Sequence, residues 1–433
     1  MTPIAEDRNR LYRKVALRLL PILFVAYVVA NLDRNNVGFA KLGFLPDLGF
    51  DERVFGLGAG LFYLGYILFE IPSNVLLERI GVRLTFLRIM LLWFLCCIAF
   101  AFMGQAWHYY ALRLLLGMAE AGYFPGVLLY LTLWVPRARR ARFTALFMCA
   151  IPVSGMVGAP VAGAIMQGAN GLFGVAGWRW LFVIEAVPAA IMAVLVYRYL
   201  SNSPAEAAWL NDAERAAIVA DLAEDQGKAP PQHRGSVFAA LANPRLYLVG
   251  AMAFALMSGL NGLNLWGPTI IKRSGVGNVL DIGLMISLPQ LFGIATQLLN
   301  AWHSDRSGER RLHAAIPALL AAVGWFLLPA AEGHAMASLA LLGVISGGLF
   351  ATTAPFWSIP SHYLAGSSAA AGIALVTTVG GLGGFASPAI VGWLTDVTGS
   401  LAAGQYFYGA IIIIGVVALF AVTKPSPDLS LPG

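Results

Sequence analysis

An arginine and a glutamate lie seven positions apart in a stretch of the chain that is otherwise apolar, aromatic or small. They are Arg113 and Glu120, within residues 113–126. Seven residues make about two turns of an α-helix, so both side chains project from one face, roughly 10 Å apart along the axis. Because a charge in the middle of a membrane costs roughly 2.5 to 3.5 kcal/mol, each side chain must face protein or water. The spacing predicts a buried cavity, with a structural ion pair to another helix as the alternative.

A second pair of charges, Asp33 and Arg34, lies midway through another apolar stretch, residues 19–40. Adjacent helical residues are about 100° apart around the axis, so the two side chains face different directions. An arginine is a permanently charged fork that suits a carboxylate, whereas an aspartate can gain or lose a proton. Burial disfavours an ionised acid and a nearby arginine favours it, so an anion bound at Arg34 would promote proton uptake by the acids. The pattern predicts cooperative binding of an anion and a proton, with a static network of charges as the alternative.

The elements that position these charges are membrane-spanning helices. Of the 433 residues, 59% are hydrophobic and 12% are charged, which differs strongly from the balance of soluble domains. We therefore predict an all-α membrane protein with twelve transmembrane helices in two six-helix bundles. Spans of about 20 residues are predicted near 19–40, 54–77, 84–104, 108–135, 141–168, 179–200, 244–271, 279–303, 312–331, 335–362, 367–394 and 402–423.

A polar stretch separates the two groups of six spans. Residues 201–243 are rich in acidic residues and prolines, which predicts a linker with a short amphipathic helix near 204–223. The predicted domains are an N-terminal bundle of residues 1–200, this linker, and a C-terminal bundle of residues 244–433. The linker is too short for a soluble output domain, which disfavours a sensor.

The distribution of basic residues predicts the orientation in the membrane. Alternate connections hold fifteen Lys and Arg residues, whereas the opposite connections hold five. Because basic residues stay in the cytoplasm, we expect both termini and the linker to be cytoplasmic. Topology also explains the net charge of +6 better than nucleic-acid binding, since the charges lie in short connections. The basic N-terminus leads directly into an apolar segment without a cleavage pattern, so we expect no cleavable signal peptide.

One short pattern occurs twice, after the second and after the eighth span. It reads acid, Arg, any residue, Gly, any residue, Arg. The residues concerned are Glu78, Arg79 and Arg83 in the first copy, and Asp305, Arg306 and Arg310 in the second. Ion pairs at helix ends can form in one conformation and break in another. Two copies at equivalent positions predict a duplicated chain with a cytoplasmic gating clamp.

These loops, the spans and the linker resemble the major facilitator superfamily, over essentially the whole chain. Five segments resemble its anion:cation symporter family, namely NLDRNNVGFA (31–40), FEIPSN (69–74), RLLLGMAEAGYFPG (113–126), GWRWLF (177–182) and WGPTIIK (266–272). That family includes bacterial carriers for galactonate, tartrate, 4-hydroxyphenylacetate, phthalate and nicotinate, and it is related to sialin and the vesicular glutamate carriers. The resemblance implies a monomer in the bacterial inner membrane that takes up a small organic anion with protons by alternating access.

The resemblance also implies roles for the charged residues. Asp33 and Glu120 correspond to the proton-coupling carboxylates of the family, and Arg34 to the ligand of the substrate anion. Arg113 would restrain the two acids electrostatically. Glu70 belongs to the segment at 69–74, where a gating role is favoured over contact with the substrate.

Substrate-binding positions are expected in the spans around the cavity. Tyr66 and Ser358 align with family positions that contact substrate, and packing is the alternative for both. Asn261 stands where many family members have Tyr, which predicts a reshaped pocket. Asn261 and Asn264 share a helix face, so they need a polar ligand, water or a hydrogen bond to another helix. Trp266 and Tyr66 suit an aromatic acid as well as a sugar acid or hydroxy acid.

The sequence contains no pattern typical of a disulfide framework, a metal site, a phosphate loop or an enzyme. Cys96, Cys97 and Cys149 fall in apolar segments and are interpreted as small hydrophobic residues. The glycines near residue 380 lie in a span and lack the Lys-Ser/Thr of a phosphate loop. We therefore expect no enzyme, no metal and no cofactor, with protons as the coupling ion and a small organic anion and the lipid bilayer as partners. An anion exchanger is the main alternative function, and the two acids argue against it.

Overall fold

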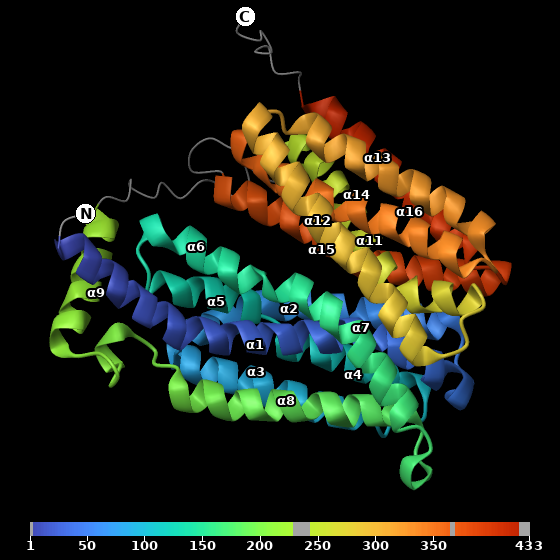
Figure 1. The fold of residues 1–433 in the computed structure, drawn as a ribbon, viewed down its shortest axis with the longest axis horizontal. Coiled ribbons are helices and arrows are strands. Elements are labelled where there is room, and N and C mark those ends of the chain that lie inside the picture. The colour runs from blue at the N-terminus through green and yellow to red at the C-terminus, as the bar shows by residue number, and fades with distance from the viewer. Residues whose placement is uncertain (1–2, 228–242, 364–368, 424–433) are drawn as a thin grey trace, which may run out of the picture. The chain divides into compact units, whose positions relative to one another are not determined.

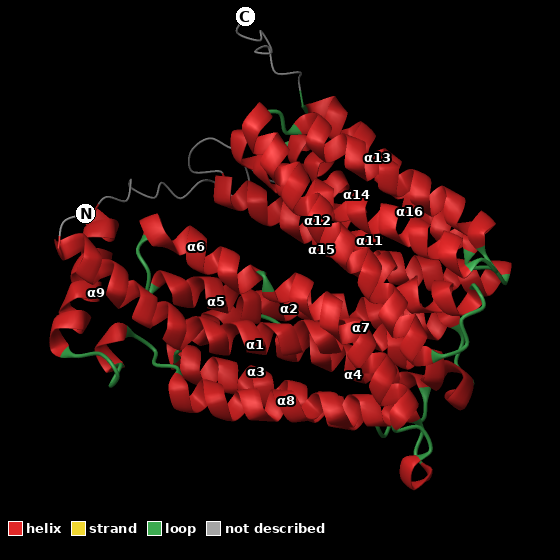
Figure 2. Cartoon of the chain, viewed as in Figure 1, coloured by secondary structure: helices red, strands yellow, loops and turns green. Residues whose placement is uncertain are grey.

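The computed structural model describes residues 3–227, 243–363 and 369–423 of the chain. In these ranges the regular structure is helical, and they contain no strand (Figure 2). Twelve helices of the described residues are long and apolar enough to cross a membrane. The prediction of an all-α membrane protein with twelve spans is confirmed.

The helices of the first half of the chain include one long helix that begins near the N-terminus. They are α1 (Pro3–Leu48), α2 (Glu52–Ile80), α3 (Val82–Phe100), α4 (Ala106–Glu120), α5 (Tyr123–Thr132), α6 (Arg137–Met148), α7 (Ala150–Gly168), the short η1 (Leu172–Gly174) and α8 (Gly177–Tyr199). Two spans consist of two helices each, α4 with α5 and α6 with α7.

The second half follows the linker. Its helices are α11 (Pro244–Arg273), α12 (Val279–Ser307), α13 (Arg311–Leu327), the short η3 (Leu328–Ala331), α14 (Ala335–Tyr363), α15 (Ala369–Thr398) and α16 (Ala402–Val422). Within this group α11 packs against α15 and α16, and α14 packs against both α12 and α13.

The repeated loops share a glycine with a positive φ, but its ψ differs, 165° at Gly81 and −1° at Gly308. Gly81 separates α2 from α3 with φ 83°, and Gly308 follows α12 with φ 69°. Both angles lie in the left-handed region, which glycine adopts without a steric penalty. A Cβ atom on Gly81 would also lie 2.6 Å from the side-chain oxygen of Asn202. The duplication of the chain stays a prediction.

The described helices form two compact units that do not follow chain order. Unit 1 contains Met1–Arg34, Leu64–Gly155 and Arg179–Gln232, and unit 2 contains Asn35–Tyr63, Met156–Trp178 and His233–Gly433. In unit 1, α3 and α8 lie side by side (Figure 1), and the rings of Phe100 and Phe182 stack between them. The predicted domain limits at 1–200, 201–243 and 244–433 stay a prediction.

Glycines allow close helix contacts inside unit 2. A Cβ atom on Gly38 of α1 would lie 2.7 Å from the carbonyl oxygen of Asn264 in α11. A Cβ atom on Gly163 of α7 would lie 2.7 Å from the carbonyl oxygen of Val279 in α12. Small residues permit this approach of backbones. The second part of α1 and part of α7 are therefore packed tightly on helices of the second half.

The linker helix begins later than predicted. The structure has a short helix η2 (Pro204–Glu206) and then α9 (Asp212–Gly227), instead of one helix near 204–223. The start is fixed by a reciprocal cap, because Asn211 accepts from the backbone N–H of Glu214 at 2.8 Å, and Glu214 accepts from that of Asn211 at 3.0 Å. Inside unit 1, α9 is held to α1 by the ion pair of Lys14 with Glu214 at 2.7 Å.

Candidate functional site

The fourth span is broken immediately after Glu120. Helix α4 ends there, Gly122 adopts the left-handed conformation with φ 88°, and α5 begins at Tyr123. Pro125 follows in the first turn of α5, where its missing N–H is tolerated. Non-helical backbone at membrane depth is tolerated where it is buried or lines a cavity. The break therefore places Glu120 at the last residue of α4, where that helix ends.

Arg34 and Glu120 form an ion pair between α1 and α4. The Nη2 of Arg34 donates to the Oε2 of Glu120 at 2.6 Å. The Glu120 side chain is 3% exposed, whereas that of Arg34 is 22% exposed. Among the described residues, the other carboxylate oxygen of Glu120 has no hydrogen-bond partner. The arginine predicted to hold the substrate anion is thus occupied by an acid of the protein.

Asp33 of α1 is hydrogen-bonded to two side chains of α3. It is 2% exposed. Its Oδ2 accepts from the indole N–H of Trp93 at 3.0 Å, and its Oδ1 accepts from the thiol of Cys97 at 3.2 Å. Cys97 is fully buried in the core, as expected for a small hydrophobic residue, and its thiol is in addition a weak donor to a buried acid. Neither Trp93 nor Cys97 carries a sequence signal that links it to Asp33.

The four charges singled out from the sequence lie together in unit 1. Arg113 is 2% exposed. Arg34 and Arg113 both interact electrostatically with Asp33, and both also act on Glu120. Two arginines and two acids leave the cluster neutral when both acids are ionised, and positive once one acid is protonated.

Tyr66 of α2 completes this cluster. The Arg34 guanidinium lies 5.4 Å from the centre of its ring, within the range of a cation–π contact. Tyr66, Arg34 and Glu120 line a cavity of about 10 Å³ together with Tyr27 and Trp93. That volume is close to the smallest that holds one water molecule. In this conformation the cluster is closed around its own ion pair.

The predicted substrate amides of the second half lie in unit 2 and bond to protein groups. Asn261 accepts from the hydroxyl of Tyr63 and donates to the carbonyl of Met257 at 2.9 Å. Asn264 accepts from the side-chain N–H of Gln290 in α12 at 3.0 Å. Hydrogen bonds to other helices are the alternative interpretation of these residues, and the structure shows them.

Trp266 lies in an aromatic cluster with a buried ion pair. It is 1% exposed, and its ring centre lies 5.4 Å from that of Phe55. The ammonium of Lys41 lies 4.4 Å from the centre of the Phe55 ring and 5.0 Å from that of Trp266. It pairs with Glu52 at 2.7 Å. Lys41 is one of the five basic residues assigned to the opposite connections, yet it is fully buried. Trp266 of α11 therefore contacts residues of both α1 and α2.

Ser358 and Glu70 have less defined surroundings. The hydroxyl of Ser358 donates to the backbone carbonyl of Pro355 at 2.7 Å. Glu70 is half-buried, and no ion pair joins it to another described residue. Substrate contact for Ser358 and gating for Glu70 stay predictions.

The two copies of the clamp loop differ in their ion pairs. In the second copy, Arg310 pairs with Asp305 at 2.6 Å, and Arg306 lies over the ring of Trp302. In the first copy, Arg83 donates to the backbone carbonyl of Tyr197. Glu78 and Arg79 are exposed, and neither forms an ion pair within the part of the chain that is described. Gating by these six residues stays a prediction.

A family model described as Major Facilitator Superfamily matches residues 23–388. The chain belongs to this superfamily. A protein of Agrobacterium vitis named "Putative tartrate transporter" is 41% identical over 98% of this chain and 97% of its own length. A "Quinolone resistance transporter" of Acinetobacter baumannii is 38% identical over 95% of this chain and 94% of its own length. The crystal structure of a bacterial homologue of the human lysosomal transporter Spinster has a TM-score of 0.74 and 15% identity, with 95% of each chain covered. The protein is a multi-pass membrane transporter of the major facilitator type, as the resemblance implied.

Proposed function

We propose that the protein is a proton-coupled symporter that imports a small organic carboxylate by alternating access. The observation that carries this proposal is the ion pair of Arg34 with Glu120 at 2.6 Å, beside the buried Asp33. A permanent cation held by a titratable acid can exchange that acid for another carboxylate. Such an arrangement links the protonation of Glu120 to the binding of an anion at Arg34.

The linkage follows from charge balance in a buried site. While Glu120 is ionised, it neutralises Arg34, and a second carboxylate there would add an uncompensated negative charge. Protonation of Glu120 removes the counterion of Arg34 and leaves a buried positive charge, which is unfavourable unless an anion replaces it. Proton and substrate anion therefore favour each other's binding, as linkage between two sites requires. Asp33 and Arg113 set the potential around both groups.

The substrate class follows from the donors available. Arg34 provides a fork for one carboxylate, and Tyr66 provides a ring and a hydroxyl beside it. Tartrate is the first candidate, because a relative that is 41% identical carries the name of a tartrate transporter. Other sugar acids, hydroxy acids and aromatic acids satisfy the same donors.

The proposal includes an orientation and a cellular location. We place the protein in the bacterial inner membrane as a monomer, with both termini in the cytoplasm, on the basis of the distribution of basic residues. In intact spheroplasts, an impermeant thiol reagent added outside should label Leu172→Cys. It should label Arg8→Cys only after the membrane is opened. Labelling of Arg8→Cys by an impermeant reagent from outside would contradict the orientation.

Uptake into proteoliposomes tests the proposed function. Purified protein is first screened by thermal shift against tartrate, galactonate and an aromatic acid, and the best ligand is used in radiolabelled form. An inward proton gradient should drive accumulation above the external concentration, and dissipation of the gradient should abolish it. Transport that ignores the gradient, or that runs only as exchange for an internal anion, would contradict symport and favour the exchanger.

A further inference from the structure

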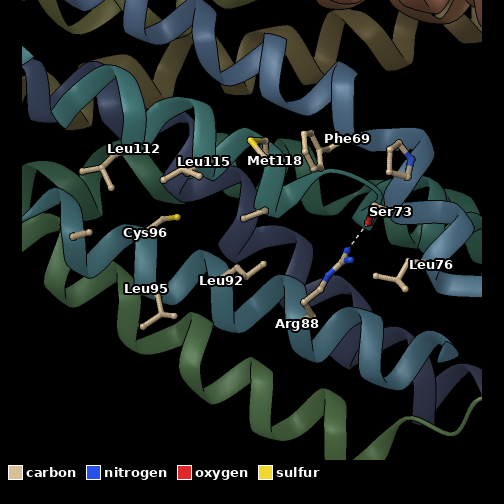
Figure 3. A pocket seen from close by; sticks show the side chains of 13 residues that line it. Phe69, Ser73, Leu76, Arg88, Leu92, Leu95, Cys96, Leu112, Leu115 and Met118 are labelled. Carbon is tan, nitrogen blue, oxygen red and sulfur yellow. Dashed lines mark hydrogen bonds between the residues drawn. The ribbon is translucent and has the colours of Figure 1, made fainter. Parts of the chain in front are cut away.

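A groove separate from the charged cluster lies between α2, α3 and α4. Its volume is about 550 Å³, within the usual range of small-molecule sites. Its walls are almost wholly apolar, and Arg88 lies toward one end (Figure 3). Leu92, Leu95 and Leu115 line it and are 42%, 58% and 47% exposed. Because these helices span the membrane, such exposed leucines face hydrocarbon, and the groove opens to lipid.

Arg88 has no acidic partner among the described residues. Its Nη2 donates to the hydroxyl of Ser73 at 2.6 Å, drawn as a dashed line in Figure 3. Its Nε is buried without a hydrogen-bond partner in the described part of the chain. A guanidinium in a membrane span usually pairs with an acid or reaches the headgroup region. Arg88 therefore has an uncompensated charge and an unused donor at the end of an apolar groove.

The length of the groove along α3 is close to the thickness of one leaflet of the hydrocarbon core. Arg88 is the seventh residue of α3, which places it roughly 9 Å from the start of the helix. From Arg88 to Ala99, the furthest groove residue on α3, the helix rises roughly 16 Å. Half of the hydrocarbon core is about 15 Å thick. Arg88 thus lies about a third of the way along the 19-residue α3, closer to the N-terminal leaflet, from which an arginine side chain extends toward the headgroups. The apolar walls continue from there to Ala99, near the far end of the helix.

We propose that this groove binds one anionic phospholipid from the leaflet that meets the N-terminus of α3. Its phosphate pairs with Arg88, and one acyl chain lies against Leu92, Leu95 and Leu115. The charge of the headgroup supplies the counterion that the protein lacks at this position. The length of the apolar walls selects a lipid over a small soluble anion.

The site has a structural connection to the broken fourth span. Ser73, which accepts from Arg88, is 4% exposed. A Cβ atom on Gly122, between α4 and α5, would lie 2.5 Å from the hydroxyl oxygen of Ser73. A lipid bound at Arg88 therefore rests, through Ser73, against the break between α4 and α5. Bound lipid should stabilise this part of unit 1.

Lipid retention measured by native mass spectrometry tests the proposal on the full-length protein. Delipidated protein is mixed with phosphatidylglycerol or phosphatidylcholine of identical acyl chains, and the fraction carrying one lipid is counted. We expect phosphatidylglycerol to be retained about tenfold more than phosphatidylcholine, with a matching rise in melting temperature. Arg88→Gln should reduce this preference to about unity. Arg198→Gln, which removes an exposed arginine of α8, should leave it unchanged.

A second variant separates loss of binding from loss of folding. Ala99→Trp fills the far end of the groove and leaves Arg88 in place, so it should lower retention of both lipids while the protein elutes as wild type in size-exclusion chromatography. Soluble glycerol 3-phosphate should not raise the melting temperature. Equal retention of the two lipids by the wild type, an Arg88→Gln variant that keeps the preference, or an equal effect of glycerol 3-phosphate would each overturn the proposal.

Discussion

Arg34 and Glu120 are joined by a 2.6 Å ion pair between the first and the fourth span, at the point where the fourth span breaks. The sequence predicts that this arginine holds the substrate and that this glutamate carries the proton. Their pairing means that both roles depend on one contact. A change to Arg34 should therefore affect both substrate binding and proton coupling, whereas a neutral Glu120 should affect coupling alone.

Substitution of Arg34 should separate charge from geometry. Arg34→Gln removes the cation and should abolish uptake. Arg34→Lys keeps the charge but loses the fork that binds a carboxylate through two N–H groups, so uptake should fall by about tenfold or more. Initial rates in proteoliposomes measure both effects. Uptake by Arg34→Gln at the wild-type rate would remove Arg34 from the substrate site.

The donors to Asp33 should tune coupling more than folding. Cys97→Ala and Trp93→Phe each leave a buried carboxylate oxygen of Asp33 without its donor. An unsatisfied buried polar group costs about 1 to 3 kcal/mol of free energy. We expect a shifted pH profile of uptake and a rate reduced by roughly tenfold. Cys149→Ala is the matched control, because Cys149 is exposed. Equal pH profiles for Cys97→Ala and Cys149→Ala would show that the thiol has no role at Asp33.

The ion pair of Lys41 with Glu52 should contribute to stability. Glu52→Gln leaves a buried ammonium without its counterion, and loss of one partner of a buried pair costs about 3 to 5 kcal/mol. The melting temperature in detergent should therefore fall. The double variant Lys41→Met/Glu52→Gln removes both charges and should recover most of the loss. Arg53→Gln, at an exposed neighbouring residue, should have little effect, and a double variant less stable than Glu52→Gln would contradict the account.

Glu309 should give a pH-dependent contribution at the start of α13. Burial works against its ionisation. The backbone N–H groups of Leu312 and His313 and the His313 side chain outweigh burial and hold the pKa of Glu309 below its usual range. Its stabilisation is therefore complete above the unfolded pKa of about 4.3 and is lost as the pH falls through the lower folded value.

The variant Glu309→Gln checks this sign. Its melting temperature should be roughly 2 °C below wild type at pH 7, and the difference should shrink as the pH falls below about 4. Glu332→Gln, at an exposed acid, serves as the control. A difference that stays constant down to pH 3 would mean that the carboxylate is not responsible.

The sequence is sufficient to predict the fold and the charged residues of the site. Long apolar segments and charges within them are strong signals, because the membrane penalises both exposed backbone and isolated charge. The residue pattern predicts that each of these charges faces protein or water, and the resemblance to the symporter family implies that Asp33, Arg34, Arg113 and Glu120 act together.

The partners of these charges could not be predicted. Trp93 and Cys97 are ordinary residues of an apolar helix, and their contact with Asp33 depends on how α3 is rotated against α1. Lys41 has the pattern of a residue in a connection, yet it is buried against Phe55 and Trp266. Such contacts depend on packing between segments far apart in the chain, which residue patterns in one sequence do not specify.

Proton movement coupled to substrate tests the central claim most directly. Proteoliposomes containing a pH-sensitive dye are prepared without a pH gradient, and the transported acid is then added outside. Wild-type protein should acidify the lumen as substrate enters. Glu120→Gln mimics the protonated acid and leaves Arg34 available, so it should still exchange labelled for unlabelled substrate without acidification. Substrate entry into wild-type vesicles without acidification, or equal acidification by Glu120→Gln, would contradict the account.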